Sequence, residues 1–307
     1  MTTPEHPRVD VVIATHHRPE QLRVAIDAVL GQDHTGPINV IVVFDQSEPD
    51  LGLEKLGGDG RSVEVITNTR TPGLAGARNS GILHGSAPLV AFCDDDDIWE
   101  PSKLRLQVES LQTRPDALTC VTGITILYED REVPRVPTPA TVELRNLARN
   151  RGMEAHPSTV LVRRDALVGP IGLVDEEIPG SYGEDFDWIL RAVQAGPICV
   201  VQEPLVRVVW GQSLFSQRWA TIVEAIDYGL RKHSVLADDR FARARLLGRK
   251  SFGLAALGRR GEAVRCAVAC LRSNWRERRA YLAVAVSTGL VSAEWLMAQA
   301  HRRGRGI

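Results

Sequence analysis

The sequence predicts an α/β fold with a mostly parallel central sheet flanked by helices, followed by an all-helical C-terminal extension. In residues 1–214, short apolar runs alternate with segments of helical periodicity, an order typical of a parallel sheet with covering helices. From residue 215 the apolar side chains recur only at helical spacing, with Arg between them. We therefore expect an α/β domain at 1–214 and a helical, basic region at 215–307.

Charge and composition agree with two regions. The 307 residues include 37 Lys and Arg, 38 Asp and Glu and 44% hydrophobic residues, as is ordinary for a globular protein. Residues 215–307 hold 18 basic and 7 acidic side chains, which leaves 19 basic and 31 acidic ones before them. No signal peptide or apolar run of about 18 residues is seen. The five cysteines form no CxxC pair, so we expect buried free thiols and a cytoplasmic location.

Four strands are predicted before residue 100, because four short apolar runs are each followed by a turn or by a helical pattern. Pro19 suits the first turn of the helix after the first run. The segment 68–81 is a glycine-spaced entry into another helix, but it is neither GxGxxG nor a P-loop. The four runs are 9–14, 39–44, 63–66 and 89–92.

The rest of the α/β region is less regular, and its elements are predicted from periodicity and from Pro and Gly content. Apolar alternation predicts strands, and acidic residues before an apolar helical face predict the start of a helix. The expected elements are a helix at 103–111, a strand at 118–128, a Pro-rich loop at 133–139, a strand at 159–162, a helix from 184, and closing strands at 200–201 and 205–209.

Four adjacent carboxylates follow the fourth predicted strand, at residues 94–97. At an effective dielectric constant near 20, two unit charges about 4 Å apart repel by roughly 4 kcal/mol. A fold that holds this cluster at the end of a core strand therefore needs a cation, and hard oxygen ligands suit Mg²⁺ or Mn²⁺. The alternative is a solvated acidic loop in which one Asp caps the next helix, although a cap needs only one carboxylate.

Polar residues also follow the other predicted strands. Thr15, Asp45 and Asn68 stand where the first three strands end. In sheets of this kind ligands bind at the carboxyl ends of the strands. The sequence therefore predicts one ligand site formed by these residues together with the acidic cluster.

Five segments are similar, in order and spacing, to family 2 glycosyltransferases of the GT-A fold. The resemblance covers residues 9–210 and leaves the region from 215 uncovered. It implies metal-dependent, inverting transfer of a sugar from a nucleotide-diphospho-sugar to an acceptor hydroxyl, with Mg²⁺ or Mn²⁺ as cofactor. A UDP- or dTDP-sugar is the favoured donor, and the acceptor is a saccharide, a lipid-linked molecule or a small molecule. The segments are VVIATHHRP, VVFDQS, NTRTPGLAGARNSG, FCDDDDIWEPSKL and GEDFDWILR.

The resemblance implies roles for residues near the nucleotide. Thr15 and His17 would border the base, and Asp45 would accept a hydrogen bond from a base N–H. Many members of the family have a second acid directly before this Asp, where this chain has Phe44. Arg78 would lie near the base and the phosphates.

The resemblance also assigns the four acids to the DXD region of the family. With the segments aligned on Pro101, Asp94 and Asp95 would contact the nucleotide-sugar, Asp95 at the ribose. Asp96 and Asp97 would bind the metal.

The resemblance places the catalytic base at Asp185, with Glu184 beside it, although both acids would also suit the first turn of a helix. Many members have a His after the last core strand, where this chain has residues 209–211, so no third metal ligand is predicted. The acceptor pocket would involve residues 153–158 and 181–182, with His156 either lining it or serving a structural role.

Two other functions stay open. A nucleotidyltransferase would share a related sheet and paired Asp, but it usually has a Gly-rich loop after the first strand, where this chain has residues 15–19. A catalytically inactive GT-A binding module is disfavoured by the presence of Asp96 and Asp185. For the basic helices a solvated face is the favoured interpretation, and peripheral contact with an anionic membrane is the alternative. No nucleic-acid partner is expected, and the oligomeric state is not predicted.

Overall fold

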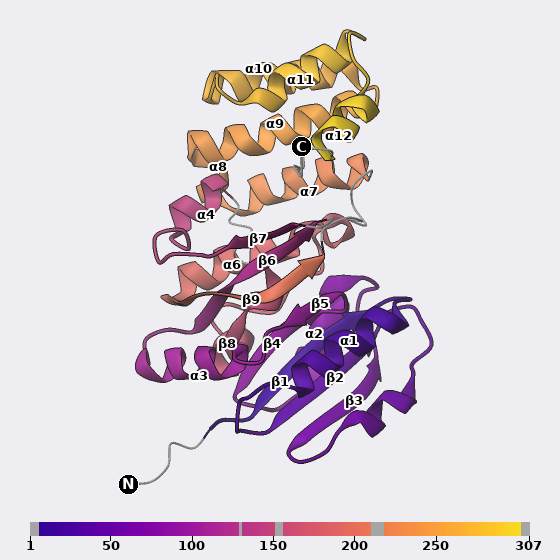
Figure 1. Ribbon diagram of the computed structural model, residues 1–307. Coiled ribbons are helices and arrows are strands. Elements are labelled where there is room, and N and C mark those ends of the chain that lie inside the picture. Colours follow the sequence, from indigo (N-terminus) through magenta and orange to yellow (C-terminus); the bar gives the residue numbers. More distant parts are fainter. Residues whose placement is uncertain (1–5, 129–130, 151–155, 210–217, 302–307) are drawn as a thin grey trace. The chain divides into compact units, whose positions relative to one another are not determined.

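The computed structural model describes residues 6–128, 131–150, 156–209 and 218–301 (Figure 1). The chain divides into two compact units. The first comprises residues 1–143, 152–176 and 184–211, and the second comprises 144–151, 177–183 and 212–307. Two short segments that precede residue 212 therefore belong to the second unit.

The first unit is built on a nine-stranded mixed sheet with the strand order β3-β2-β1-β4-β8-β6-β9-β5, and with β7 paired to β6. β3, β2, β1 and β4 are parallel, as are β6 and β9, while the pairs made by β8, β7 and β5 are antiparallel. The strands are β1 (Val9–Thr15), β2 (Ile38–Phe44), β3 (Arg61–Thr67), β4 (Leu89–Asp94), β5 (Asp97–Trp99), β6 (Thr119–Tyr128), β7 (Arg131–Arg135), β8 (Leu161–Arg163) and β9 (Ile198–Val209).

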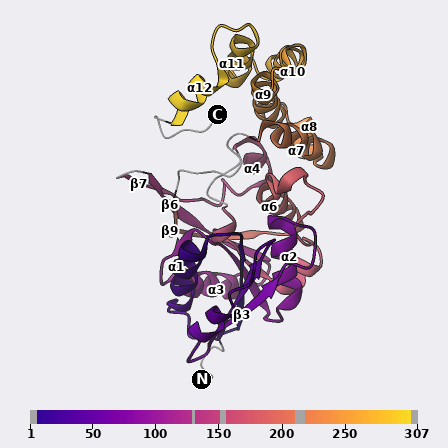
Figure 2. The ribbon, with the colours of Figure 1, turned by 90° about the vertical axis from the view of Figure 1, so that its right-hand side faces the viewer.

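Helices cover both faces of this sheet (Figure 2). Side chains alternate between the faces of a strand, so Val11 and Val12 point to opposite sides. The face of Val11 packs with the apolar side chains of α1 and α3 in one buried cluster. On the other face, Gly81 of α2 lies against Val12, and Trp188 of α6 meets Phe92 edge to face. These helices are α1 (Pro19–Leu30), α2 (Leu74–His84), α3 (Lys103–Thr113) and α6 (Glu184–Ala195).

The prediction of a loop in the Pro-rich stretch is wrong in its first part, because Arg131–Arg135 form the strand β7. Pro134 is tolerated because β7 is an edge strand, where one backbone N–H can be missing from the ladder. The two predicted closing strands are a single strand, β9. Its pairing with β6 is irregular where Pro204 faces Gly123, and the polar residues there interrupt the apolar pattern.

Short elements complete the first unit. The 3₁₀ helix η3 (Pro157–Thr159) leads into β8, where the sequence suggested a strand from 159. The remaining elements are η1 (Leu51–Leu56) and α5 (Arg164–Val168). The five cysteines of the chain are free thiols, as expected, and all except the half-buried Cys266 are buried.

The second unit is helical, and α9 lies at its centre, in contact with the other helices α4, α7, α8, α10, α11 and α12. Phe252 of α9 is fully buried. Asp239 caps α9 by accepting from the backbone N–H groups of Phe241 and Ala242, and it pairs with Arg149 of α4 at 2.7 Å. The bounds are α4 (Leu144–Asn150), η4 (Pro179–Ser181), α7 (Trp219–Lys232), α8 (Ser234–Asp238), α9 (Arg240–Ala256), α10 (Arg260–Ser273), α11 (Arg278–Ser287) and α12 (Ala293–His301). Among the described helices we find none with the length and apolar character of a membrane span.

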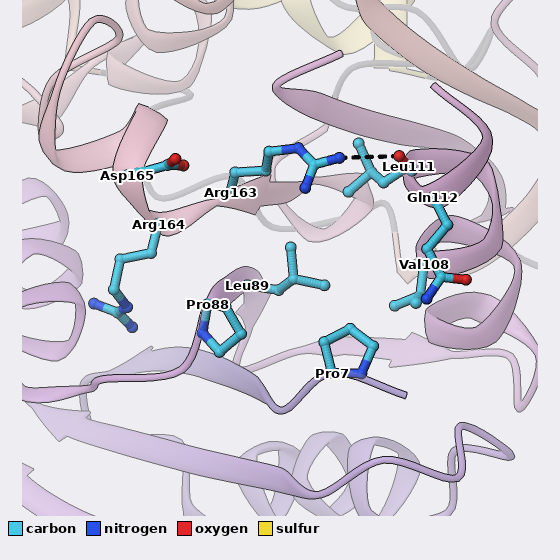
Figure 3. Close-up of a pocket in the computed structure, with 9 residues that line it drawn as sticks. All are labelled: Pro7, Pro88, Leu89, Val108, Leu111, Gln112, Arg163, Arg164 and Asp165. Carbon is cyan, nitrogen blue, oxygen red and sulfur yellow. Dashed lines mark hydrogen bonds between the residues drawn. The ribbon is translucent and has the colours of Figure 1, made fainter. Parts of the chain in front are cut away.

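A cavity of about 460 Å³ opens in the first unit near Leu89, at the amino-terminal end of β4 (Figure 3). Its two cationic side chains are already engaged. Arg163 donates to the carbonyl of Leu111 at 3.0 Å, and Arg164 donates to Asp10 at 2.7 Å. Ligands of such sheets bind at the carboxyl ends of the strands, so this cavity is not the candidate site.

We predict that Gly81→Ala lowers the free energy of unfolding by about 1–3 kcal/mol, the usual effect of overpacking. A Cβ at this position would lie 2.5 Å from Cγ1 of Val12, so α2 must move away from the sheet. Urea denaturation followed by Trp fluorescence measures the change. Gly58→Ala is the control in the same unit, since its Cβ would meet no atom within 4 Å. Equal stability of the two variants would contradict the packing argument.

Candidate active site

Asp45, directly after β2, holds the loop between β3 and α2. Its Oδ1 accepts from Nδ2 of Asn68 at 2.8 Å, and its Oδ2 accepts from the backbone N–H of Gly73 at 2.9 Å. Asp45 is buried, and its own backbone N–H donates to Thr15 at the end of β1. The ends of the first three strands therefore meet at this carboxylate, as the sequence predicted for a ligand site.

His17 and Gln46 follow β1 and β2 with left-handed backbone angles, at φ of 54° and 48°. Such values are uncommon for residues other than glycine and gather at functional sites. The His17 ring is exposed and lies 4.3 Å from the ring of His16. The predicted base-binding residue is therefore accessible at the carboxyl end of β1.

The four adjacent carboxylates separate into two pairs. Asp95 and Asp96 form the two-residue turn between β4 and β5, and Asp94 and Asp97 are the residues on either side of that turn. A turn of four residues brings its first and last residues together. Asp94 and Asp97 therefore share one environment, while Asp95 and Asp96 share another.

Arg18 binds the two carboxylates of the turn. Its Nη1 donates to Oδ1 of Asp95 at 3.1 Å and to Oδ2 of Asp96 at 2.5 Å. Asp95 is buried and also accepts from Oγ1 of Thr15 at 2.8 Å, whereas the Asp96 side chain is 42% exposed. Burial raises the pKa of Asp95, and the contacts with Thr15 and Arg18 oppose that effect. No role was predicted for Arg18 from the sequence, although Arg18 stands in the same segment as Thr15.

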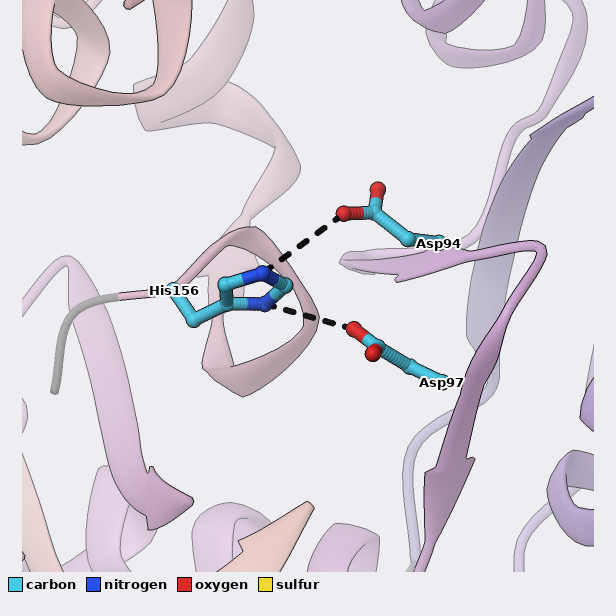
Figure 4. A group of neighbouring side chains, drawn as sticks. All are labelled: Asp94, Asp97 and His156. Atoms are coloured by element: carbon cyan, nitrogen blue, oxygen red, sulfur yellow. Dashed lines mark ion pairs between the residues drawn. The ribbon is translucent and has the colours of Figure 1, made fainter. Parts of the chain in front are cut away.

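His156 joins the other two carboxylates (Figure 4). Its Nδ1 lies 3.3 Å from Oδ2 of Asp97, and its Nε2 lies 3.8 Å from Oδ2 of Asp94. One ligand atom from each residue lies within 4.8 Å of the others, so the three could hold a metal ion. Ser158 donates to Asp97 at 2.5 Å, and burial raises the pKa of Asp97 to about 7. We call Asp94, Asp97 and His156 the Asp-Asp-His cluster.

The structure brings one of the two predicted metal ligands, Asp97, into the Asp-Asp-His cluster and leaves the other, Asp96, beside Arg18. His156 was predicted to line the acceptor pocket or to be structural, and nothing in its local sequence indicates a partner some sixty residues earlier. Trp210 and Gly211, where the resemblance would place a His, lie outside the described residues, as do 153–155.

Arg78 connects β4 with α6. Its Nη2 donates to Oδ1 of Asp94 at 2.5 Å, and its Nη1 donates to Oε1 of Glu184 at 2.6 Å. Arg78 is only 3% exposed. Burial alone would lower its pKa, but Asp94 and Glu184 outweigh burial and raise the pKa, so the guanidinium stays charged. The acids predicted for catalysis are thereby fixed next to the acidic turn.

Glu184 and Asp185 begin α6 but differ in surroundings. Glu184 is buried against Arg78, while Asp185 is partly exposed, and its Oδ1 accepts from the backbone N–H of Phe186 at 2.7 Å. Asp185 is thus the more accessible of the two acids.

Glu176 gives the loop between β3 and α2 a second anchor. Its Oε1 accepts from Nε of Arg70 at 2.5 Å and from Nδ2 of Asn79 at 2.7 Å. Its Oε2 accepts from the backbone N–H of Thr71 at 3.3 Å. Burial would raise the pKa of Glu176, but the hydrogen bonds from Asn79, Arg70 and Thr71 outweigh it and lower the pKa to about 2.

Comparison with known proteins identifies this chain as a glycosyltransferase. The sequence matches the profile of glycosyl transferase family 2 over residues 10–168, more than half of the chain. The chain belongs to that family, which confirms the resemblance found in the sequence and favours glycosyl transfer over the alternative of a nucleotidyltransferase.

One relative and two solved structures illustrate the similarity. The chain is 24% identical over 199 residues to the UDP-Glc:alpha-D-GlcNAc-diphosphoundecaprenol beta-1,3-glucosyltransferase WfgD of Escherichia coli, covering 62% of this chain and 75% of WfgD. S. aureus TarS 1-349 in complex with UDP-GlcNAc has a TM-score of 0.62 at 15% identity, covering 97% of this chain and 92% of TarS 1-349. The mannosyltransferase PcManGT from Pyrobaculum calidifontis, in complex with GDP-Man and Mn2+, has a TM-score of 0.55 at 16% identity, covering 94% and 82%. These likenesses confirm the predicted GT-A fold.

We predict that Glu176→Gln lowers stability at pH 7 by roughly 1–3 kcal/mol. The pKa of Glu176 is lower in the folded chain than its ordinary value of 4.5, so its stabilisation is complete above about pH 4.5 and is lost toward pH 2. The stability difference between wild type and variant should therefore shrink over that interval. Urea denaturation at several pH values measures it.

Glu20→Gln, at an exposed position in the first turn of α1, is the control and should show little difference at any of these pH values. A difference between wild type and Glu176→Gln that stays constant from pH 7 to pH 2 would contradict the ionic role of Glu176.

Proposed function

We propose that this protein is a metal-dependent, inverting glycosyltransferase that moves a sugar from a UDP- or dTDP-sugar to an acceptor hydroxyl. The observation that carries the proposal is the buried contact of Arg78 with Asp94 and Glu184. It joins the acidic turn, where a diphosphate would be held, to the helix that carries the proposed base. Family membership and the UDP-GlcNAc complex of TarS support a nucleotide-sugar donor.

The donor set of the Asp-Asp-His cluster fits Mg²⁺ or Mn²⁺, since carboxylate oxygens suit both ions and imidazole suits transition metals. A bound ion would offset the charge of the departing diphosphate as a Lewis acid. The Mn2+ in the PcManGT complex supports this choice. Asp97 and His156 would hold the ion, and Asp96, which the resemblance assigns to the metal, would join them once Arg18 leaves it.

The nucleotide would bind along the ends of β1 and β2. Oδ2 of Asp45 already accepts from Gly73 and from Gln46, whereas among the described residues Oδ1 accepts only from Asn68. Oδ1 therefore retains a second lone pair for a base N–H. Thr15 and His17 would border the base, and Asp95 would contact the ribose. Arg78 would act through the acids it holds, close to the phosphates.

Asp185 would be the general base that takes the proton from the acceptor hydroxyl as that oxygen attacks the anomeric carbon. Glu184 is already paired with Arg78, so it would orient the site rather than exchange protons. A single displacement from the face opposite the leaving group inverts the anomeric configuration.

The acceptor proposed here is a lipid-linked saccharide. The printed name of WfgD describes transfer to a diphosphoundecaprenol-linked sugar, which supports this class. Within the described part of the first unit, residues 156–158 are the segment from which we expect acceptor contacts. We also propose a cytoplasmic location, with peripheral membrane contact through the basic helices.

We predict that Asp185→Asn binds the donor with unchanged affinity but loses transfer by about 10²–10⁴-fold, the usual contribution of a positioned general base. Calorimetry with UDP and a radiolabelled transfer assay measure the two quantities. Asp165→Asn is the matched control, because Asp165 also begins a helix and accepts from the next backbone N–H, at 2.8 Å. Equal activity of the two variants would contradict the role of Asp185 as the general base.

We predict that His156→Ala and Asp97→Asn weaken Mn²⁺ binding by about tenfold or more, as expected when a metal site is disrupted. Asp96→Asn should weaken it only when UDP is present, because Arg18 occupies that carboxylate in the free protein. Calorimetric titration of Mn²⁺ with and without UDP separates these cases, with thermal melting as the check on folding. Unchanged Mn²⁺ affinity in His156→Ala would argue against the cluster as the metal site.

A further inference from the structure

One side of α10, a helix of the second unit labelled in Figure 1, carries exposed apolar and basic side chains in one stripe. Val264, Val268 and Arg272 recur every fourth residue and are exposed, the two valines at 38% and 42%. Arg265 is exposed beside them. Residues four apart lie on the same side of a helix, so these side chains form a continuous surface.

The connection between α10 and α11, which follows this stripe in the sequence, adds exposed aromatic residues. Trp275 is 66% exposed, and Tyr281 is 52% exposed. Oη of Tyr281 donates to the backbone carbonyl of Trp275 at 2.8 Å, so the two aromatic residues lie together. The guanidinium of Arg276 lies 5.0 Å from the centre of the Trp275 ring. We call Val264, Val268, Arg272, Trp275, Arg276 and Tyr281 the α10–α11 face.

The charge of this face is not neutralised by neighbouring acids. Residues 260–281 contain six Arg and two Glu. Glu262 pairs with Arg259, and Glu277 pairs with Arg279. Within the described part of the chain, Arg272 and Arg276 form no ion pair with a carboxylate.

We propose that the α10–α11 face binds the surface of an anionic bilayer. Arg side chains attract anionic headgroups, and exposed aliphatic side chains beside them can enter the boundary between headgroups and acyl chains. Trp and Tyr favour the same boundary because each has a large apolar ring with a polar end. The proposal names the surface for the membrane contact suggested above and does not depend on glycosyl transfer.

Two other partners fit this face less well. A second copy of the chain, related by a twofold axis, would bring the same arginines toward each other without acids between them. A nucleic acid would use the arginines through its phosphates but would leave Val264 and Val268 without a counterpart. Of these three partners, only a lipid surface offers negative charge and an apolar layer together.

The test is flotation of the full chain with phosphatidylcholine vesicles, with and without phosphatidylglycerol. We expect binding only to the anionic vesicles, and at least a tenfold loss for the double variant Arg272→Glu with Arg276→Glu. Trp275→Ser should weaken binding severalfold without changing the net charge. The matched control is Arg231→Glu with Arg243→Glu, which makes the same charge change at exposed positions of α7 and α9 and should retain most of the binding.

Several results would overturn the proposal. One is equal binding to neutral and anionic vesicles, and another is no binding to either kind of vesicle. A third is a loss of binding in the control variant that equals the loss in the Arg272 and Arg276 variant. Retarded migration of DNA in a gel without vesicle binding would indicate a nucleic-acid surface instead. Self-association that the Arg272 and Arg276 variant abolishes, without vesicle binding, would indicate an interface between copies. Because vesicle binding needs no donor or acceptor, its failure leaves the transfer assay of Asp185→Asn unaffected.

Discussion

One buried guanidinium determines the arrangement of the site. Arg78 reaches Asp94 at the end of β4 and Glu184 at the start of α6, two carboxylates ninety residues apart in the sequence. Removal of one partner from a buried ion pair typically costs 3–5 kcal/mol, because the remaining charge has no counterion. The pairing therefore fixes the position of α6 against the acidic turn. It also engages Glu184, so that the neighbouring Asp185 is the acid left accessible.

The turn between β4 and β5 places four identical side chains in two different environments. Asp94 and Asp97 flank the turn and meet His156, while Asp95 and Asp96 form it and meet Arg18. A chain of four carboxylates is thus stabilised from two sides by different groups. This division explains how such a charge density is tolerated beside a buried sheet before any ligand arrives.

Much of the first unit could be predicted from the sequence, because buried parallel strands appear as apolar runs and their ends carry polar residues. The acidic cluster and Asp45 were placed at one site for that reason, whereas the acids of α6 were assigned by the resemblance to the family. The direction in which each carboxylate points could not be predicted. The side chains of adjacent turn residues point in different directions, and those directions depend on the backbone angles of the turn. His156 has no local signal, and β7 was taken for a loop because Pro usually interrupts strands.

The edge strand β7 affects how the protein behaves in concentrated solution. Exposed strand edges are templates on which another chain can add a strand, and proteins suppress this with Pro and charged residues. β7 contains Pro134, which has no amide hydrogen, and the charged residues Arg131, Glu132 and Arg135. At this edge the row of donors is incomplete and the side chains are strongly hydrated, so intermolecular sheet growth, the first step toward fibrous aggregates, is disfavoured there.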